Sequence, residues 1–293
     1  MKQKKIPDKF PYLLLLPAFA FLGFIVIFSG LYNIYISFFS MKLTRPGLGR
    51  YVGLWNYVDL LCNPLFHKVL KNSIVWTVGS VIPIVLIGLF LAVILNQKLR
   101  IAAVARVIII LPWIVPGVVV ATVWRLLLHA DFGLFNDLLF RLGLINSHQA
   151  WLGKSSTAML GVIIANVWKG IPFYVVLFYA ALQTIPEQLY EAAKMDGANM
   201  WQNFAHITMP QLKSVFGIAI ALAFMWSWNF FDLIFVMTEG GPARSTEIMP
   251  IHIYSTGFLY YRMSDAATIS VFLILVFFMC FLPYQYLQKR KFE

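Results

Sequence analysis

The sequence predicts an all-α integral membrane protein with six transmembrane helices, and three observations lead to that class. Hydrophobic residues make up 60% of the chain, charged residues only 12%, and the mean hydropathy is +0.78. Soluble domains carry charges at about a quarter of their positions. Six charge-poor stretches are each long enough to cross about 30 Å of hydrocarbon as a helix. None of them alternates between polar and apolar residues as a barrel strand does.

The first predicted span covers residues 11–39 and follows a tail that contains Lys2, Lys4, Lys5 and Lys9. Such a start imitates a secretory signal peptide. The apolar run continues well past the small-residue site Ala18-Phe19-Ala20, however, and exceeds the apolar core of a signal peptide. We therefore expect an uncleaved membrane anchor.

The remaining spans are expected at residues 72–96, 107–124, 157–182, 215–237 and 266–287. The third contains Pro112 and Pro116-Gly117, and the fourth contains Pro172. Interrupted membrane helices are tolerated where the freed backbone groups line a cavity or lie buried in protein. These two spans are thus the expected walls of a binding site. Both termini are expected in the cytoplasm, because the terminal tails and the 98–106 segment are short and rich in Lys and Arg.

A polar segment between the fourth and fifth spans, residues 184–212, predicts a helix-turn-helix at the membrane surface. Pro186 is typical of a helix start, because proline needs no N–H partner in the first turn. Asp196-Gly197 predicts the turn, and Asn199 is placed to cap a second short helix. Pro210 is expected to open the next span. A polar loop with this pattern suits insertion into a groove on a partner protein.

This segment resembles the EAA loop of binding-protein-dependent ATP-binding-cassette (ABC) importers. The resemblance rests on Glu191-Ala192-Ala193, on Asp196-Gly197 and on Ile207-Thr208-Met209-Pro210. Flanking motifs are similar to those of the carbohydrate-uptake branch, the maltose/glycerol-phosphate-type permeases: Leu182 to Pro186, Asn229-Phe230-Phe231-Asp232 and Thr238-Glu239-Gly240-Gly241-Pro242. The resemblance covers nearly the whole chain. It implies a single transmembrane domain, residues 1–293, with the type I ABC importer permease fold.

The resemblance also implies a function and a set of partners. A permease of this family is a multi-pass subunit of the bacterial cytoplasmic (inner) membrane that translocates a sugar or oligosaccharide by alternating access. It pairs with a second homologous permease subunit and with two copies of a cytoplasmic ABC ATPase, which bind ATP and Mg, so the permease itself needs no cofactor. An extracytoplasmic solute-binding protein delivers the sugar. ATPase coupling would fall on Glu191, Ala192, Ala193, Asp196, Gly197 and Pro210.

Helical spacing groups side chains that suit a sugar. On the fourth span, four residues follow i, i+3, i+4 and i+7 and share one face: Asn166, Lys169, Gly170 and Phe173. On the fifth, Ser227, Phe230 and Ile234 share a face in the same way. Aromatic rings stack on the apolar face of a sugar, while amides and hydroxyls hydrogen-bond its hydroxyl groups. The resemblance to maltose-type permeases places substrate contacts at Trp113, Gly117, Asn166, Lys169, Gly170, Phe173, Ala223, Ser227 and Phe230.

Lys169 lies near the middle of its predicted span. A lysine at the bilayer centre costs about 2.5–3.5 kcal/mol on insertion scales, so it should face a cavity or pair with an acid. Two interpretations stay open. One is a structural ion pair with Asp232 or a partner subunit, and the other is contact with an acidic oligosaccharide or a sugar phosphate. Maltose-type relatives have an apolar side chain here, so the substrate is expected to differ from maltose.

Signals for catalysis are missing from the sequence. Gly153-Lys154-Ser155 ends like a phosphate loop, but His148 stands where the upstream glycine is needed. The histidines show no metal spacing, and the basic residues flank membrane spans, so neither a metal site nor nucleic-acid binding is expected. The prediction is a translocating subunit that is not an enzyme. An ion-coupled secondary carrier is the alternative, but it would need intramembrane acids, and Asp232 alone lies inside the predicted spans.

Overall fold

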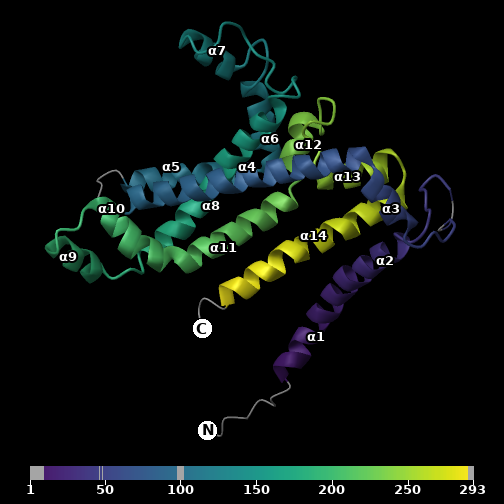
Figure 1. Ribbon diagram of the computed structural model, residues 1–293, viewed down its shortest axis with the longest axis horizontal. Coiled ribbons are helices and arrows are strands. Elements are labelled where there is room, and N and C mark those ends of the chain that lie inside the picture. The colour runs from purple at the N-terminus through teal and green to yellow at the C-terminus, as the bar shows by residue number, and fades with distance from the viewer. Residues whose placement is uncertain (1–9, 46, 48, 98–101, 290–293) are drawn as a thin grey trace. The chain divides into compact units, whose positions relative to one another are not determined.

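The computed structural model describes residues 10–45, 47, 49–97 and 102–289, and among these the regular elements are helical (Figure 1). One isolated β bridge joins Phe39 and Tyr51. The helices, with π-helical turns labelled η, are α1 Phe10–Leu22, η1 Gly23–Phe28, α2 Ser29–Ile36, α3 Trp55–Cys62, α4 Pro64–Leu95, α5 Ala102–Ile114, α6 Gly117–Leu127, α7 Leu134–Arg141, α8 Ala158–Leu182, α9 Glu187–Met195, α10 Met200–Asn203, η2 Phe204–Thr208, α11 Met209–Trp228, α12 Asp232–Thr238, α13 Met249–Tyr254, η3 Ser255–Leu259 and α14 Met263–Lys289. The all-α prediction is confirmed.

Five helical segments of the described chain are long and apolar enough to cross a membrane. They are Leu14–Ile36, Pro64–Leu95, Ala158–Leu182, Met200–Trp228 and Met263–Pro283. The pair α5 and α6 adds a sixth apolar segment, which is bent by 97° at residues 115–116. Six spans are therefore present when the bent pair counts as one. The tail lysines used to predict orientation, Lys2, Lys4, Lys5 and Lys9, lie outside the described residues.

The fifth predicted span, 215–237, differs from the structure. The helix that covers the first part of this span runs without interruption from Met200 to Trp228. The chain then leaves the helical conformation, and α12 begins at Asp232. Pro210 was expected to open this span, and it lies in the first turn of α11, which continues directly from the π-helical turn η2.

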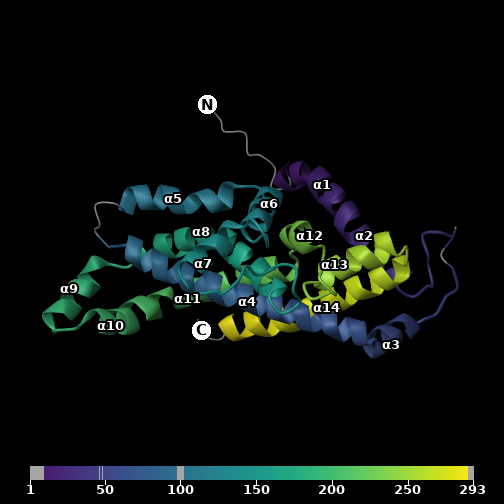
Figure 2. The ribbon, with the colours of Figure 1, turned by 90° about the horizontal axis from the view of Figure 1, so that it is seen from above.

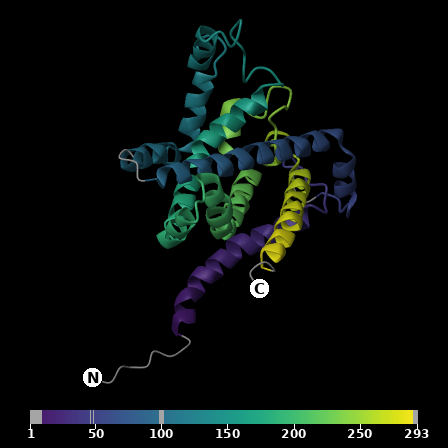
Figure 3. The same ribbon diagram turned by 60° about the vertical axis from the view of Figure 1, so that its left-hand side comes forward.

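The chain divides into two compact units. Unit 1 comprises Met1–Phe66 and His252–Cys280, and unit 2 comprises His67–Ile251 and Phe281–Glu293. In unit 1, α1, η1 and α2 follow one another as one uninterrupted helix (purple in Figure 3). The end of α2 is fixed by Ser37, whose Oγ lies 2.7 Å from the Tyr57 hydroxyl and whose carbonyl accepts a hydrogen bond from Asn56.

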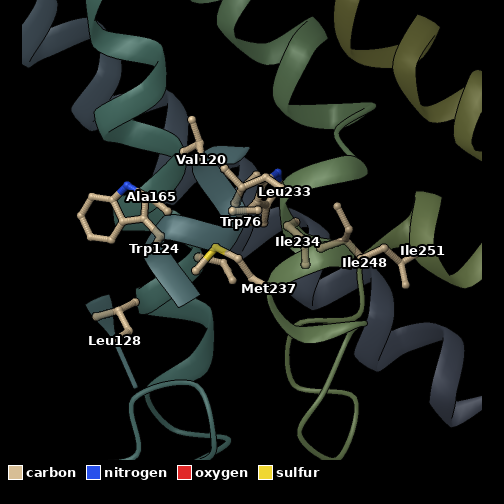
Figure 4. Close-up of a cluster of buried hydrophobic side chains, with 12 residues drawn as sticks. Trp76, Val120, Trp124, Leu128, Ala165, Leu233, Ile234, Met237, Ile248 and Ile251 are labelled. Atoms are coloured by element: carbon tan, nitrogen blue, oxygen red, sulfur yellow. The ribbon is translucent and has the colours of Figure 1, made fainter. Parts of the chain in front are cut away.

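Unit 2 contains two apolar cores. In the first, α4, α8 and α11 pack together through buried side chains that include Val85, Phe178 and Ala219. In the second, Trp76 of α4 lies among side chains of α6, α8, α12 and α13, as Figure 4 shows. These cores hold α4, α8 and α11 in place, and the walls of the candidate site are built on those helices. The pair α9 and α10 lies at one end of unit 2 (Figure 2).

Candidate translocation site and coupling loop

The break between α5 and α6 is held by a lysine from a neighbouring helix. Lys169 of α8 donates a hydrogen bond from Nζ to the carbonyl oxygen of Val115, over 2.7 Å. That carbonyl follows the last residue of α5, where backbone oxygens have no partner within the helix. The ammonium therefore also meets the negative end of the α5 dipole. Such a partner allows a lysine to lie at this depth.

The start of α6 meets a group of the opposite charge. A Cβ atom added to Gly117, the first residue of α6, would overlap the carboxylate of Asp232, the first residue of α12. A carboxylate beside a helix N-terminus is stabilised by the positive end of the dipole. In the part of the chain that the structure describes, Lys169 and Asp232 form no ion pair with each other. Lys169 instead lies at the C-terminal end of α5, and Asp232 lies at the N-terminal end of α6.

Eight of the nine residues predicted to contact substrate line one cavity of about 130 Å³ in unit 2. The cavity is bounded by α4, α5, α8, α11 and the turn that follows α11. The ninth residue, Gly117, lies against Asp232 and does not contribute to this lining. The lining residues are Ile84, Trp113, Asn166, Lys169, Gly170, Phe173, Tyr174, Ala223, Trp226, Ser227 and Phe230.

Aromatic rings supply most of the apolar wall. The Phe173 ring centroid lies 4.8 Å from that of Trp226 and 5.9 Å from that of Trp113. A further ring, Phe230, packs on Trp76 with centroids 5.5 Å apart. Rings gathered in this way present flat apolar faces, the surfaces on which sugar rings stack.

Two polar side chains of the cavity are buried, and their hydrogen-bonding groups have no protein partner in the part of the chain that the structure describes. Asn166 is 5% exposed and Ser227 is 3% exposed. Within the described residues, neither the Asn166 amide nor the Ser227 hydroxyl forms a side-chain hydrogen bond, whereas the Ser227 carbonyl accepts from Trp76 Nε1 at 2.9 Å. Buried polar groups in proteins are nearly always paired, with protein, water or ligand. These two groups are therefore available to a polar ligand.

Three lining residues were missed by the sequence prediction. Trp226 completes an i, i+3, i+4, i+7 series with Ala223, Ser227 and Phe230, so extending the spacing argument back by one turn would have found it. Tyr174 follows Gly170 by four residues and could have been found in the same way. Ile84 of α4 carried no signal, because it is one of many apolar residues in its span.

Residues 184–212, called the coupling loop after the role expected of them, form a helix-turn-helix, as the sequence predicted. Gly197 follows α9 in a left-handed conformation, with φ +80°, and its N–H donates to the Lys194 carbonyl. Asn199 and Gln202 then form a reciprocal capping box at the start of α10, with hydrogen bonds of 2.9 and 2.8 Å. The Asn199 cap predicted from the sequence is confirmed.

The residues assigned to ATPase coupling are mostly accessible. Glu191, Ala192, Asp196, Gly197 and Pro210 are at least partly exposed, and Ala193 is half-buried. The phosphate-loop-like tripeptide lies elsewhere, where Lys154 donates to the Gln149 side chain over 2.6 Å and Ser155 donates to the Pro242 carbonyl. These side chains therefore tie segments outside the coupling loop together.

Comparison with known proteins gives curated relatives of nearly the same length. The chain is 34% identical over 268 residues to the probable ABC transporter permease protein YurN of Bacillus subtilis, with 91% of each chain covered. It is 35% identical to the trehalose/maltose transport system permease protein MalF of Thermococcus litoralis, covering 94% of this chain and 91% of the relative. It is 32% identical to the diacetylchitobiose uptake system permease protein DasB of Streptomyces coelicolor, covering 91% and 83%.

Solved structures agree on the fold. A bacterial ABC transporter involved in the import of the acidic polysaccharide alginate contains a chain that superposes with a TM-score of 0.84 at 22% identity, covering 97% of this chain and 96% of that one. A bacterial alginate ABC transporter in complex with an alginate pentasaccharide-bound periplasmic protein gives a TM-score of 0.83 at 22% identity, covering 97% and 95%. Residues 84–292 match the model of one family. The chain belongs to the family of binding-protein-dependent transport system inner membrane components, the permeases of ABC importers.

Proposed function

We propose that this permease moves a sugar or a short oligosaccharide through the cavity between α8 and α11 by alternating access. The observation that carries the proposal is the cavity lining, in which Trp113, Phe173 and Trp226 supply ring faces while Asn166 and Ser227 supply unpaired polar groups. The names of the relatives that transport trehalose, maltose and diacetylchitobiose support the same substrate class.

The assembly we propose has a second permease chain, two cytoplasmic ABC ATPases that bind ATP and Mg, and an extracytoplasmic solute-binding protein. Both termini and the α9–α10 loop would then face the cytoplasm, where an ATPase groove receives the loop. The exposed Glu191 and Asp196 and the self-contained capping box support a docking role for this loop. The related importer structure with a periplasmic protein bound supports the outer partner.

Transport by the assembled importer in vesicles tests the proposal. With its solute-binding protein outside and ATP inside, the complex should take up a labelled trehalose- or chitobiose-type sugar, and an ionophore should leave that uptake unchanged. Uptake that needs an ion gradient and no ATP would instead indicate a secondary carrier. Chemical conversion of the sugar during uptake would indicate an enzyme.

An acidic sugar is a second candidate, because Lys169 lines the cavity. Its ammonium has three N–H donors, and the described contacts use one of them, toward Val115. The remaining donors can meet a carboxylate or phosphate of an acidic oligosaccharide or a sugar phosphate.

Substitution of Lys169 separates a role in substrate binding from a purely structural one. If Lys169 binds an acidic group, Lys169→Met should abolish uptake of the acidic sugar while neutral sugars still enter. Lys169→Arg should retain part of the acidic-sugar uptake. If its only role is to hold the Val115 carbonyl, Lys169→Met should lower the thermal midpoint of the complex and reduce uptake of every sugar equally.

A further inference from the structure

A second and larger cavity lies along the C-terminal part of α4, on residues that follow Ile84 of the sugar site. It is a groove of about 660 Å³ between the last turns of α4 and the helices α9 and α10, all within unit 2. Its volume falls in the range of about 300–1,000 Å³ that is typical of ligand sites. Neither the proposed sugar path nor the docking of an ATPase on the exposed side of α9 accounts for this groove.

Polarity in the groove changes along α4. Leu86, Phe90 and Val93 line its apolar part, and Asn96 and Gln97 line its end. From Leu86 to Leu95, the last residue of α4, the helix rises about 14 Å, at about 1.5 Å per residue. That length is about half of the roughly 30 Å hydrocarbon core, so it equals the depth of one leaflet. The polar end then lies at the membrane surface.

The polar end is rich in donors and carries a positive charge. Lys194 of α9 is the charged residue among those that line the groove, and no carboxylate of the described chain lines it. Gln183 donates to the Asn96 side-chain oxygen, which leaves the Asn96 NH₂ group as a donor toward the groove. Trp201, which is 80% exposed, stands at the rim. Tryptophan is enriched where a membrane meets water.

We infer that this groove binds one anionic phospholipid of the leaflet that faces the coupling loop. The acyl chain lies along Leu86, Phe90 and Val93. The phosphate accepts hydrogen bonds from Lys194 and from the side-chain amides of Asn96 and Gln97, which follow α4. An ammonium and amide N–H groups match a phosphate in charge and in hydrogen bonding. A zwitterionic lipid presents the same tail but no net charge, so headgroup charge decides which lipid the groove prefers.

The test uses the complete importer in nanodiscs made of equal parts phosphatidylcholine and phosphatidylglycerol. Trace lipid with a diazirine near the end of the acyl chain, in either headgroup form, is photolysed, and labelled peptides are mapped by mass spectrometry. The phosphatidylglycerol probe should label residues 86–94 about fivefold more than the phosphatidylcholine probe, which corresponds to about 1 kcal/mol for one lysine at an anionic surface. Raising the share of unlabelled phosphatidylglycerol in the nanodisc should lower labelling by the phosphatidylglycerol probe in the unaltered protein.

Variants identify the groups responsible. Lys194→Gln should bring the labelling ratio of the two probes close to one, whereas Lys213→Gln, at another exposed lysine on α11 outside the groove, should keep it. Val93→Trp should fill the groove and reduce labelling by both probes. Equal labelling by both probes in the unaltered protein would overturn the inference, since it would indicate ordinary surrounding lipid. Label that appears only on a partner subunit, with α4 silent, would also overturn it, because protein would then cover the groove.

Discussion

Charged side chains inside a membrane protein need a compensating group, and Lys169 and Asp232 find theirs in the backbone. Lys169 bonds the Val115 carbonyl beyond the end of α5, and Asp232 lies against the start of α6 at Gly117. Each charge faces the helix end of opposite polarity, so the broken span is stabilised at both of its inner ends. Glycine at position 117 suits this arrangement, because a Cβ there would force the Asp232 carboxylate to move.

Gly117→Ala is expected to destabilise the permease by about 1–3 kcal/mol, the usual cost of overpacking. The added methyl group overlaps the carboxylate of Asp232, at the start of α12. The thermal unfolding midpoint in detergent measures the effect. Adding Asp232→Ala should recover part of the loss, because the clashing group is then absent. A midpoint that falls equally in the single and the double variant would show that the carboxylate does not limit this site.

Asn166→Ala should reduce sugar uptake by about two- to tenfold, since a hydrogen bond to a neutral partner contributes about 0.5–1.5 kcal/mol. Phe173→Ala should reduce it further by removing the central ring of the cavity. Both variants should keep their ATPase subunits bound. Ile164→Ala is the matched control, because it lies on an exposed face of α8 and does not line the cavity. Unchanged uptake kinetics in the Asn166→Ala, Phe173→Ala double variant would contradict the site.

Residue spacing along a helix predicted most of the cavity lining, because residues at i, i+3 and i+4 face the same way wherever the helix goes. It could not assign Gly117, which lies beyond a 97° bend whose direction is set by packing of α6 on α12. Nor could it find Ile84, since a residue on a distant helix joins a cavity only through tertiary packing.

At the scale of elements, hydropathy predicted the number of spans better than their continuity. Residues 215–237 form one apolar run in the sequence, yet the helix stops after Trp228 and restarts at Asp232. The residues between are Asn229, Phe230 and Phe231, and the two aromatic residues keep the hydropathy high across the break. Phe230 lines the sugar cavity from this turn, and Ile234, predicted to share its face, is buried in the core around Trp76 instead.

The turn of the coupling loop offers a matched pair of glycines for a test. Gly197 and Gly143 have φ values of +80° and +69°, both have open space around them, and each donates its N–H three residues back, to Lys194 and Phe140. Proline fixes φ near −65° and removes the N–H, so both Gly197→Pro and Gly143→Pro should disturb their turns to a similar extent.

Only the change in the coupling loop is expected to affect coupling. Gly197→Pro should weaken ATPase association or separate ATP hydrolysis from uptake, while Gly143→Pro should leave both near normal. Co-purification of the ATPase and sugar-stimulated ATP hydrolysis measure the two effects. Similar losses in both variants would mean that general turn damage, rather than coupling, explains the defect.

At the scale of the whole molecule, the regions proposed for sugar passage and for ATPase coupling lie apart along the chain. The sugar cavity lies among the middle part of α8 and the last turns of α11, and the coupling loop begins after the end of α8 at Leu182. Sequence alone predicted both regions, since one depends on helical spacing and the other on local turn chemistry. The division into two compact units was not predicted, because it arises from packing between segments far apart in the chain.

The hydrogen bonds of the coupling loop close largely on the loop itself, through the Asn199–Gln202 capping box and the Tyr190–Thr208 hydroxyl pair 2.9 Å apart. Its shape therefore owes little to the side chains that surround the sugar. The loop can then change during evolution to fit a different ATPase while the transported substrate stays the same. The substrate can likewise change while the ATPase stays the same. Such a segment can be exchanged between related proteins. Grafting residues 184–208 between permeases of this family is expected to change which ATPase binds and to leave the transported substrate unchanged.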